Sequence, residues 1–525
     1  MLDNRPSPSG GTINPVLPGF YPDPSACRVD GVDGTWYYVI NSSFEYLPGL
    51  PIHRSRDLVT WEFVGHAIHR PGQLDLGSVK DSDGLFAPTI RHDGHRFLVV
   101  CTLVGEAPQR GNFIVTAPDA AGPWSDPVWW SDNGIDPSLF FDSDGRVWAQ
   151  GTRPAAEPEW DQQTQVWIRE LDPGTLQLIG EEHVVWSGAV RGAVWAEGPH
   201  LYRHGRHVYL LASEGGTSIH HALSVARADS PAGPFVGCPG NPIFTHRHLG
   251  RDYPVINVGH ADLLEDATGQ WWALLLASRP IDGVDVLGRE TFLVPVTWED
   301  EWPVFAAGVG TVVANPPRPL WSSLHDGVRP RARQPELAVR RFPDDVGEIL
   351  GDRISLPGGP GLDSAHPSYV ARRLTAIPAT LSVTIEELPA TAAAGLAIRY
   401  NTAVWGEAVV QPTPEGARLS IVTHDGGGPR VIREQVVDGP AQGTIRLHVE
   451  GLLAHASWTP TDGQVHSMGE FPLELMGAAV SGGFVGVTYG LHNQGSGVVV
   501  ARILGESGPE DRPSADSALT DEAHV

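Results

Sequence analysis

Residues 135–151, IDPSLFFDSDGRVWAQG, hold the pattern from which we predict the fold of this 525-residue chain. A short apolar run is followed by the turn sequence DSDG and by a second apolar run that contains Trp148. Apolar runs of this length on either side of an Asp-Gly turn are typical of a β-hairpin. The stretch therefore predicts two antiparallel strands.

Four other stretches end in the same kind of turn and aromatic-rich strand. They are VDGVDGTWYYVI (29–40), RHDGHRFLVV (91–100), RHGRHVYLLA (203–212) and EDATGQWWALLLA (265–277). Their second strands are predicted to begin near Trp36, Phe97, Val147, Val208 and Trp271, in steps of roughly 50 to 63 residues, a spacing typical of propeller blades. A blade is a four-stranded antiparallel sheet that buries its faces against its neighbours. The five stretches therefore predict a five-bladed β-propeller.

Composition and the second half of the chain extend this prediction. Numerous glycines and prolines, 61 and 46, separate short apolar runs and favour an all-β protein. Alternating runs such as ATLSVTIEEL (379–388) and GGFVGVTYGL (482–491) follow a Pro- and Arg-rich stretch and indicate a β-sandwich. We expect four parts: a propeller over 12–315, a linker over 316–332, a concanavalin-like β-sandwich over 333–505 and a disordered acidic tail over 506–525.

Charge and cysteine content exclude several classes of partner and site. The net charge of -26 makes nucleic acid and anionic membrane surfaces unfavourable partners. Three widely spaced cysteines indicate neither a disulfide framework nor a paired-cysteine zinc site. No run of about 18 apolar residues occurs in the sequence. We expect a cytoplasmic protein with a neutral substrate, and the sequence leaves a homo-oligomer open.

A polar or small residue precedes each predicted second strand by 10 to 13 positions. In blade order these residues are Asp23, Ala87, Asp136, Glu197 and His260. Because the innermost strand of each blade lines the central channel, residues at one repeat position converge on one axis. Three carboxylates and a histidine are therefore predicted to face one funnel. Gathered carboxylates repel one another and resist burial, which points to chemistry.

Each of these residues also has a structural interpretation. The Asp-Pro-Ser sequences at Asp23 and Asp136 can be turns in which Asp accepts backbone N–H bonds, and His260 can be a hydrogen-bonded core histidine. Their shared register favours the functional interpretation. We predict no metal ligand and no required cofactor, although a carboxylate-and-histidine funnel also suits a calcium ion in the channel.

At these motifs the chain resembles glycoside hydrolase family 43, in particular its β-xylosidase and α-L-arabinofuranosidase branch with a C-terminal sandwich. The matching segments, in the family's order, include NPVLPGFYPDPS, GIDPSLFFDSDGRVW, EGPHLY, GHADLLED and LGRETFLVPVTW. The resemblance implies that Asp23 is the general base, that Asp136 tunes and positions the acid, and that Glu197 is the general acid.

The same resemblance implies a set of sugar-binding residues. Arg289 would hold the terminal sugar, His260 would lie at the floor of the channel, and Phe44 and Phe86 would form aromatic walls. A guanidinium presents a fixed fork of donors that suits vicinal hydroxyls. The alternative for Arg289 is an ordinary surface salt bridge.

The implied activity is an inverting exo-glycosidase that releases terminal β-D-xylose or α-L-arabinofuranose from oligosaccharides. Inversion needs a protonated acid at the leaving oxygen and a carboxylate that activates water on the opposite face. Asp23 and Glu197 fall on different predicted blades, which suits that separation. Two alternatives stay open: a retaining β-fructosidase, whose Asn-Asp-Pro motif is missing here, and a non-catalytic glycan-binding propeller.

Overall fold

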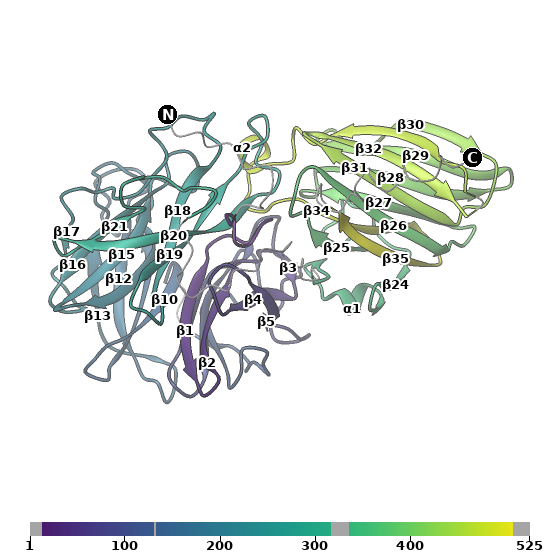
Figure 1. The fold of residues 1–525 in the computed structure, drawn as a ribbon. Helices are drawn as coiled ribbons and strands as arrows, with labels where there is room; N and C mark the ends of the chain where they lie inside the picture. The colour runs from purple at the N-terminus through teal and green to yellow at the C-terminus, as the bar shows by residue number, and fades with distance from the viewer. Residues whose placement is uncertain (1–12, 131–132, 317–334, 462, 508–525) are drawn as a thin grey trace, which may run out of the picture. The chain divides into compact units, whose positions relative to one another are not determined.

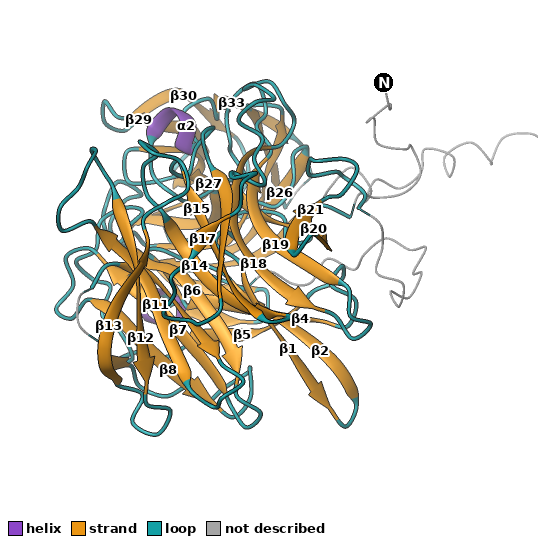
Figure 2. Cartoon of the chain, turned by 90° about the vertical axis from the view of Figure 1, so that its left-hand side faces the viewer, coloured by secondary structure: helices purple, strands orange, loops and turns teal. Residues whose placement is uncertain are grey.

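The computed structural model describes residues 13–130, 133–316, 335–461 and 463–507. Strands and loops make up nearly all of this part of the chain (Figure 2). Two helices of four residues each interrupt them, α1 (Pro343–Val346) and α2 (Ala478–Ser481). The prediction of an all-β protein is confirmed.

Five four-stranded antiparallel sheets follow one another along the N-terminal part of the described chain (Figure 1). Blade 1 contains β1 (Ser25–Gly31), β2 (Gly34–Ile40), β4 (Gly49–Ser55) and β5 (Glu62–Ile68). Blade 2 contains β6 (Gly84–His92), β7 (Phe97–Val104), β8 (Gly111–Ala117) and β9 (Val128–Trp129). Blade 3 contains β10 (Ile135–Phe141), β11 (Val147–Pro154), β12 (Thr164–Leu171) and β13 (Leu178–Trp186).

The last two blades repeat this order. Blade 4 contains β14 (Glu197–His204), β15 (His207–Glu214), β16 (Ala222–Ala228) and β17 (Val236–Gly237). Blade 5 contains β18 (Ile256–Glu265), β19 (Trp271–Ser278), β20 (Arg289–Glu299) and β21 (Trp302–Phe305). The predicted five-bladed propeller is confirmed, and the second strands of blades 2, 3 and 5 begin at the predicted residues.

The innermost strands β1, β6, β10, β14 and β18 form a closed ring in which each contacts the next. The N-terminal segment runs beside β20 of the last blade. The backbone N–H of Val16 donates to the carbonyl of Thr291 over 2.9 Å, and the Asn14 side chain donates to the carbonyl of Leu293 over 2.9 Å. The segment that leads into the first blade is thereby fixed to the last blade, which joins the two ends of the ring.

Apolar side chains fill the spaces between blades. One buried cluster joins blades 1 and 2 through residues such as Ile52, Ile90 and Phe113. A second joins blades 4 and 5 through residues such as Leu211 and Leu275. Because these contacts bury the faces of the sheets, they stabilise the ring and leave the channel to polar side chains.

The second compact unit is a two-sheet sandwich. Its seven-stranded sheet has the order β23 (Glu348–Leu350), β24 (Arg353–Pro357), β35 (Val498–Ser507), β26 (Ala379–Glu387), β31 (Gly443–Glu450), β32 (Leu453–Pro460) and β33 (His466–Pro472). The other sheet has the order β25 (Tyr369–Arg373), β34 (Thr488–Gly495), β27 (Ala392–Arg399), β28 (Val404–Thr413), β29 (Gly416–Asp425) and β30 (Arg430–Val437). This is the β-sandwich that the alternating runs predicted.

The boundary between the units is more complex than the expected break at residue 333. The unit that contains the propeller takes in the described residues up to Val346, together with Ala371–Arg373 and Met476–Val487. Within it, β22 (Ala338–Val339) pairs with β3 (Tyr46–Leu47) beside blade 1. Most of the expected linker (317–332) and tail (508–525) lies outside the described residues.

One predicted strand of the second half is wrong in its first part. The stretch 482–491 was expected to be a single strand, but β34 begins only at Thr488. Gly482 and Gly483 have φ values of 69° and 88°. A left-handed backbone of this kind interrupts the pleat of a strand. Residues 482–487 therefore form a loop of the propeller unit.

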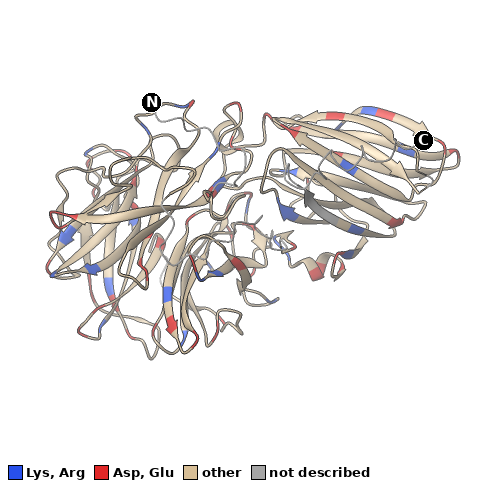
Figure 3. Cartoon of the chain, viewed as in Figure 1, with Lys and Arg blue, Asp and Glu red and all other residues tan. Residues whose placement is uncertain are grey.

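Acidic and basic positions are scattered over the loops and strands of each unit (Figure 3). The acidic residues behind the net charge of -26 are therefore not gathered in one element of the described chain. Over the described residues no helix is long and apolar enough to cross a membrane.

Candidate active site

Each blade has a residue in the left-handed backbone region, in or just before its innermost strand, at the repeat position that the sequence singled out or next to it. These residues are Asp23 (φ 52°), Ala87 (36°), Asp136 (55°), Gly198 (57°) and His260 (43°). Four of the five therefore adopt a conformation that costs about 1–3 kcal/mol for a residue other than glycine. Such strain is concentrated at functional sites, and here it turns the side chains of the repeat toward the channel.

The predicted register is wrong by one position in blade 4. Glu197 was expected to align with Asp23 and Asp136, but the left-handed residue of blade 4 is Gly198. Gly198 precedes a proline, as Asp23 and Asp136 do, and Glu197 lies one residue earlier. A Cβ atom at Gly198 would lie 3.0 Å from Nε2 of His260. Only glycine fits this position, so the carboxylate of blade 4 comes from the neighbouring residue.

Asp23 is buried among donors and cations. The Ser42 hydroxyl donates to its Oδ2 over 2.6 Å, and Nη1 of Arg289 donates to its Oδ1 over 3.2 Å. Nδ1 of His260 lies 3.7 Å from the same Oδ1. Burial opposes ionisation, but Arg289, His260 and the Ser42 hydrogen bond hold the pKa of Asp23 below its ordinary value. Asp23 is therefore an ionised carboxylate.

Glu197 has the opposite environment. It is 8% exposed, and its Oε1 has no hydrogen-bond donor among the described residues. Burial, followed by repulsion from Asp136 and Asp23, raises the pKa of Glu197 well above its ordinary value, although Arg289 counteracts this. Glu197 therefore holds its proton to higher pH than an ordinary glutamate, as a general acid requires.

Asp136 lies between these two roles. Its Oδ2 accepts a hydrogen bond of 3.0 Å from the backbone N–H of Gly198, the residue that follows Glu197. Burial and the negative charge of Asp23 raise the pKa of Asp136, although His260 and the Gly198 N–H oppose the shift. The carboxylate thereby fixes the chain at Glu197 and also disfavours ionisation of the Glu197 side chain.

Arg289 is 5% exposed, which rules out the surface salt bridge that the sequence left open. Its guanidinium lies near the rings of two phenylalanines, 5.7 Å from the centroid of Phe44 and 5.5 Å from that of Phe484. The ring of Phe86 completes an aromatic cluster, with centroids 5.3 Å from Phe44 and 5.6 Å from Phe484. The structure thus brings Arg289 together with both predicted aromatic residues.

Phe484 was not predicted as part of the site. Its backbone N–H donates to the Ser82 hydroxyl over 3.0 Å, and its carbonyl accepts from Nη2 of Arg289 over 3.4 Å. It belongs to the loop 476–487, which the sequence pattern assigned to the sandwich. The signal that could have revealed it is the pair of glycines before the phenylalanine, which favours a loop over a strand.

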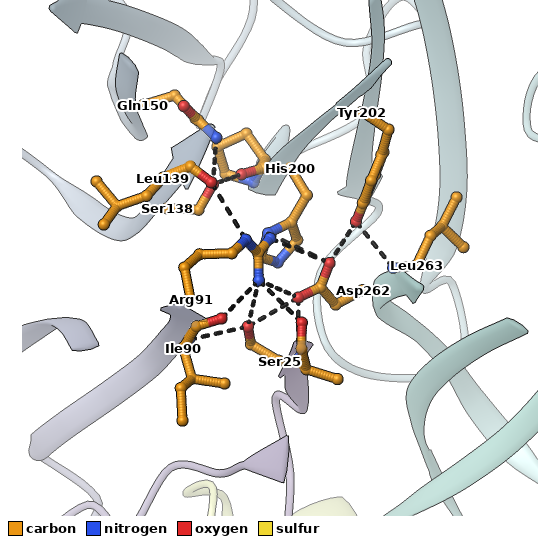
Figure 4. A network of polar contacts seen from close by, with 12 residues as sticks. Ser25, Ile90, Arg91, Ser138, Leu139, Gln150, His200, Tyr202, Asp262 and Leu263 are labelled. Atoms are coloured by element: carbon orange, nitrogen blue, oxygen red, sulfur yellow. Dashed lines mark hydrogen bonds and ion pairs between the residues drawn. The ribbon is translucent and has the colours of Figure 1, made fainter. Parts of the chain in front are cut away.

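A second polar layer fills the channel further along the innermost strands (Figure 4). Its centre is Arg91, whose guanidinium donates to Asp262 through Nη1 over 2.7 Å and through Nη2 over 3.3 Å. The hydroxyls of Ser25 and Tyr202 also donate to the Asp262 carboxylate, over 2.8 Å and 2.5 Å. Burial opposes ionisation of Asp262, but the Arg91 guanidinium and the hydrogen bonds hold its pKa far below the ordinary value.

The same guanidinium is bonded to every blade. Arg91 is carried by β6 of blade 2, and its partners on the other innermost strands are the carbonyl of Ala26 (3.1 Å), the carbonyl of Leu139 (3.2 Å), Nδ1 of His200 (3.2 Å) and Asp262. Burial lowers the pKa of His200 to about 3, so its ring is neutral and Nδ1 accepts from the guanidinium. One side chain therefore cross-links all five blades at the centre of the ring.

The residues in this second layer do not fit a calcium ion in the channel, which the sequence left open for the funnel of carboxylates and histidine. Calcium takes six to eight oxygen ligands, usually with several carboxylates. Here the Asp262 carboxylate already has a guanidinium and two hydroxyls as partners, and Arg91 supplies the positive charge. Over the described residues no group of three His, Cys, Asp or Glu side chains is arranged to hold a metal ion.

Family models match both halves of the chain. The model described as "Glycosyl hydrolases family 43" matches residues 12–303. The model described as "Beta xylosidase C-terminal Concanavalin A-like domain" matches residues 352–500.

Individual proteins are similar over most of the chain or over the propeller. A xylosidase/arabinosidase from Butyrivibrio fibrisolvens is 50% identical over 301 residues, which is 57% of each chain. A non-reducing end α-L-arabinofuranosidase from Bacteroides ovatus is 32% identical over 92% of this chain and 91% of its own length. The crystal structure of a xylan β-1,4-xylosidase from Bacillus halodurans C-125 matches with a TM-score of 0.83 and 27% identity, over 94% of this chain and 99% of the other.

Proposed function

This chain belongs to glycosyl hydrolase family 43, and on that premise we propose that it is an inverting, exo-acting glycosidase that removes terminal xylose or arabinose from oligosaccharides. The related proteins are named as xylosidases and arabinosidases, which supports pentoses as the released sugars. The cytoplasmic location and the homo-oligomer stay predictions.

The observation that carries the proposal is that two buried carboxyl groups have environments that shift their pKa values in opposite directions. The environment lowers the pKa of Asp23 and raises that of Glu197. Environments that push two carboxyl groups apart in pKa assign the base and the acid of a glycosidase. Asp23 accepts a proton from the attacking water, and Glu197 donates its proton to the departing oxygen.

The remaining site residues bind and position. One N–H group of the Arg289 guanidinium donates to the Asp23 carboxylate, so this side chain connects the sugar pocket to the base. Asp136 holds the backbone beside the acid through Gly198, and its charge keeps Glu197 protonated. The half-buried rings of Phe86 and Phe484 offer apolar surface to the C–H groups of a sugar, and the buried ring of Phe44, which is 1% exposed, packs against both.

Two measurements test the proposal. Purified protein is assayed against nitrophenyl β-D-xyloside, α-L-arabinofuranoside and β-D-galactoside, and the anomer of the first-formed sugar is followed by NMR. We expect activity on a pentoside and inversion at the anomeric carbon. Retention would favour the fructosidase-like mechanism, and binding of xylo-oligosaccharides without hydrolysis would favour the glycan-binding alternative.

A further inference from the structure

Trp195 differs from the other tryptophans in the described part of the chain. It is 40% exposed, and the others are buried or half-buried. Over the described residues no acceptor takes the N–H of its indole ring. A large apolar side chain and an unused donor are therefore open at one place on the surface, which is unusual for tryptophan in a protein without a partner.

The backbone holds Trp195 firmly in a strained conformation. Its φ is 48°, in the left-handed region that costs about 1–3 kcal/mol for a residue of this size. Its N–H donates to the carbonyl of Gln162 over 3.2 Å. The carbonyls on either side are also bonded, that of Val194 to Gly215 N–H over 2.8 Å and that of Ala196 to the Thr164 hydroxyl over 2.9 Å. Strain that the neighbouring loops maintain in this way points to a function.

The indole ring is supported from one side by a loop of blade 4. A Cβ atom at Gly216 would lie 3.1 Å from both Cε3 and Cζ3 of the Trp195 ring. Gly216 itself has φ 73°, a conformation that glycine adopts readily. The ring therefore packs directly on the backbone of this loop, and its remaining surface is left for a ligand.

The position of Trp195 in the chain defines which part of a substrate it would meet. Only Ala196 separates it from Glu197, and Trp195 and Glu197 are thus at most about 7 Å apart at their Cα atoms. A general acid must lie beside the oxygen of the leaving group. An exposed ring two residues from the acid in the chain is therefore a candidate to meet the leaving group.

We propose that Trp195 is the platform that binds the first sugar of the leaving group. A xylose ring of the departing oligosaccharide lays its apolar C–H face on the indole, and one of its hydroxyls accepts from the indole N–H. Trp195 is thereby a specificity-determining residue that favours sugar leaving groups over small alcohols. The inference rests on the proposed function, because it needs a glycosidic bond to be cleaved at Glu197.

The test compares two substrates that share the terminal sugar and differ in the leaving group. Xylobiose presents a sugar ring to Trp195, whereas trifluoroethyl β-D-xyloside presents a small alcohol. For Trp195→Ala we expect kcat/KM on xylobiose to fall about tenfold relative to kcat/KM on the trifluoroethyl substrate, the effect of losing one aromatic contact. Trp195→Phe should restore most of this ratio, and the inhibition constant for free xylose should not change.

Trp36→Ala is the matched control. Trp36 is half-buried and lies in blade 1 beside the 31–34 turn, at the end of the strands opposite the site. Its loss should leave the ratio at the wild-type value. An unchanged ratio in Trp195→Ala, or an equal fall on both substrates in Trp195→Ala and Trp195→Phe, overturns the inference. A wild-type protein that cleaves no pentoside overturns the proposed function instead.

Discussion

The propeller channel contains two layers of buried polar residues, which differ in how their carboxylates are paired. The layers are two residues apart in the chain, as Asp23 and Ser25 show in blade 1 and His260 and Asp262 in blade 5. In the catalytic layer Asp23 shares Arg289 and His260, while Glu197 keeps an oxygen without any donor among the described residues. In the second layer Asp262 is matched by Arg91 and two hydroxyls (Figure 4). Both layers are built from residues in or next to the innermost strands of the blades.

The difference teaches how to distinguish chemistry from architecture among buried polar residues. A buried carboxylate that has a cation for its charge and donors for its lone pairs stays ionised. Removing one of these partners destabilises the fold. A carboxylate that is buried without matching partners has a displaced pKa and can exchange a proton. Glu197 belongs to the second kind and Asp262 to the first.

The largest effect should follow removal of the base or the acid from the catalytic layer. Asp23→Ala should lower kcat/KM by about 100-fold to 10,000-fold on xylobiose and on nitrophenyl xyloside alike, because no carboxylate activates the water. Glu197→Ala should impair xylobiose hydrolysis similarly but spare much of the activity on the nitrophenyl substrate, whose leaving group needs no proton. A leaving-group dependence in Asp23→Ala alone would exchange the two roles.

The next largest effect should follow from breaking the second layer. Arg91→Met leaves the Asp262 carboxylate buried without its cation, and the loss of one partner of a buried pair costs about 3–5 kcal/mol. We expect the calorimetric unfolding midpoint of the propeller to fall by several degrees. Arg146→Met, which removes a solvent-exposed ion pair with Asp144, should leave the unfolding midpoint close to that of the wild-type protein. Equal midpoints for the two variants would contradict the role of Arg91.

A smaller effect, of opposite sign, should follow from neutralising the acid. Because the pKa of Glu197 is raised in the folded protein, its ionisation opposes folding as pH rises above the value of the unfolded chain. Glu197→Gln should therefore stabilise the protein by about 1 kcal/mol at pH 8 and much less at pH 4, measured by thermal unfolding.

The control for this prediction is a second buried glutamate in blade 4. Glu214 accepts hydrogen bonds from the N–H groups of Ala189 and Val190 and from the Ser224 hydroxyl. Glu214→Gln should destabilise the protein, since an amide cannot accept all of these bonds. If both substitutions stabilise the protein, or if neither does, then the lack of hydrogen-bond donors does not make Glu197 differ from Glu214.

The smallest effect should come from chelation. The Arg91 guanidinium supplies the positive charge at the centre of the second layer, so a chelator has no metal ion to remove from this position. Incubation with excess EDTA should change kcat/KM and the unfolding midpoint by less than the error of the assay. A loss of activity that added calcium restores would contradict the assignment of this position to a guanidinium.

Much of the fold could be predicted because its signals are local. Turns such as DSDG and the aromatic strands after them recur in every blade, and Phe97, Val147 and Trp271 are the first residues of β7, β11 and β19. The repeat also brought Asp23, Asp136 and His260 to one position. It failed by one residue at Glu197, because a sequence interval does not show which residue adopts the left-handed backbone before a proline.

What the sequence determined by itself is therefore the sheet type, the number of blades and the kinds of side chain that reach the channel. These depend on the alternation of apolar residues and on turns, which are properties of neighbours in the chain. The tertiary structure alone decided that Phe484 joins Phe44 and Phe86, that Arg91 bonds to all five blades, and that the pKa values of Asp23 and Glu197 are shifted in opposite directions. Those outcomes depend on contacts between residues hundreds of positions apart, and on burial and charge that exist only when the ring has closed.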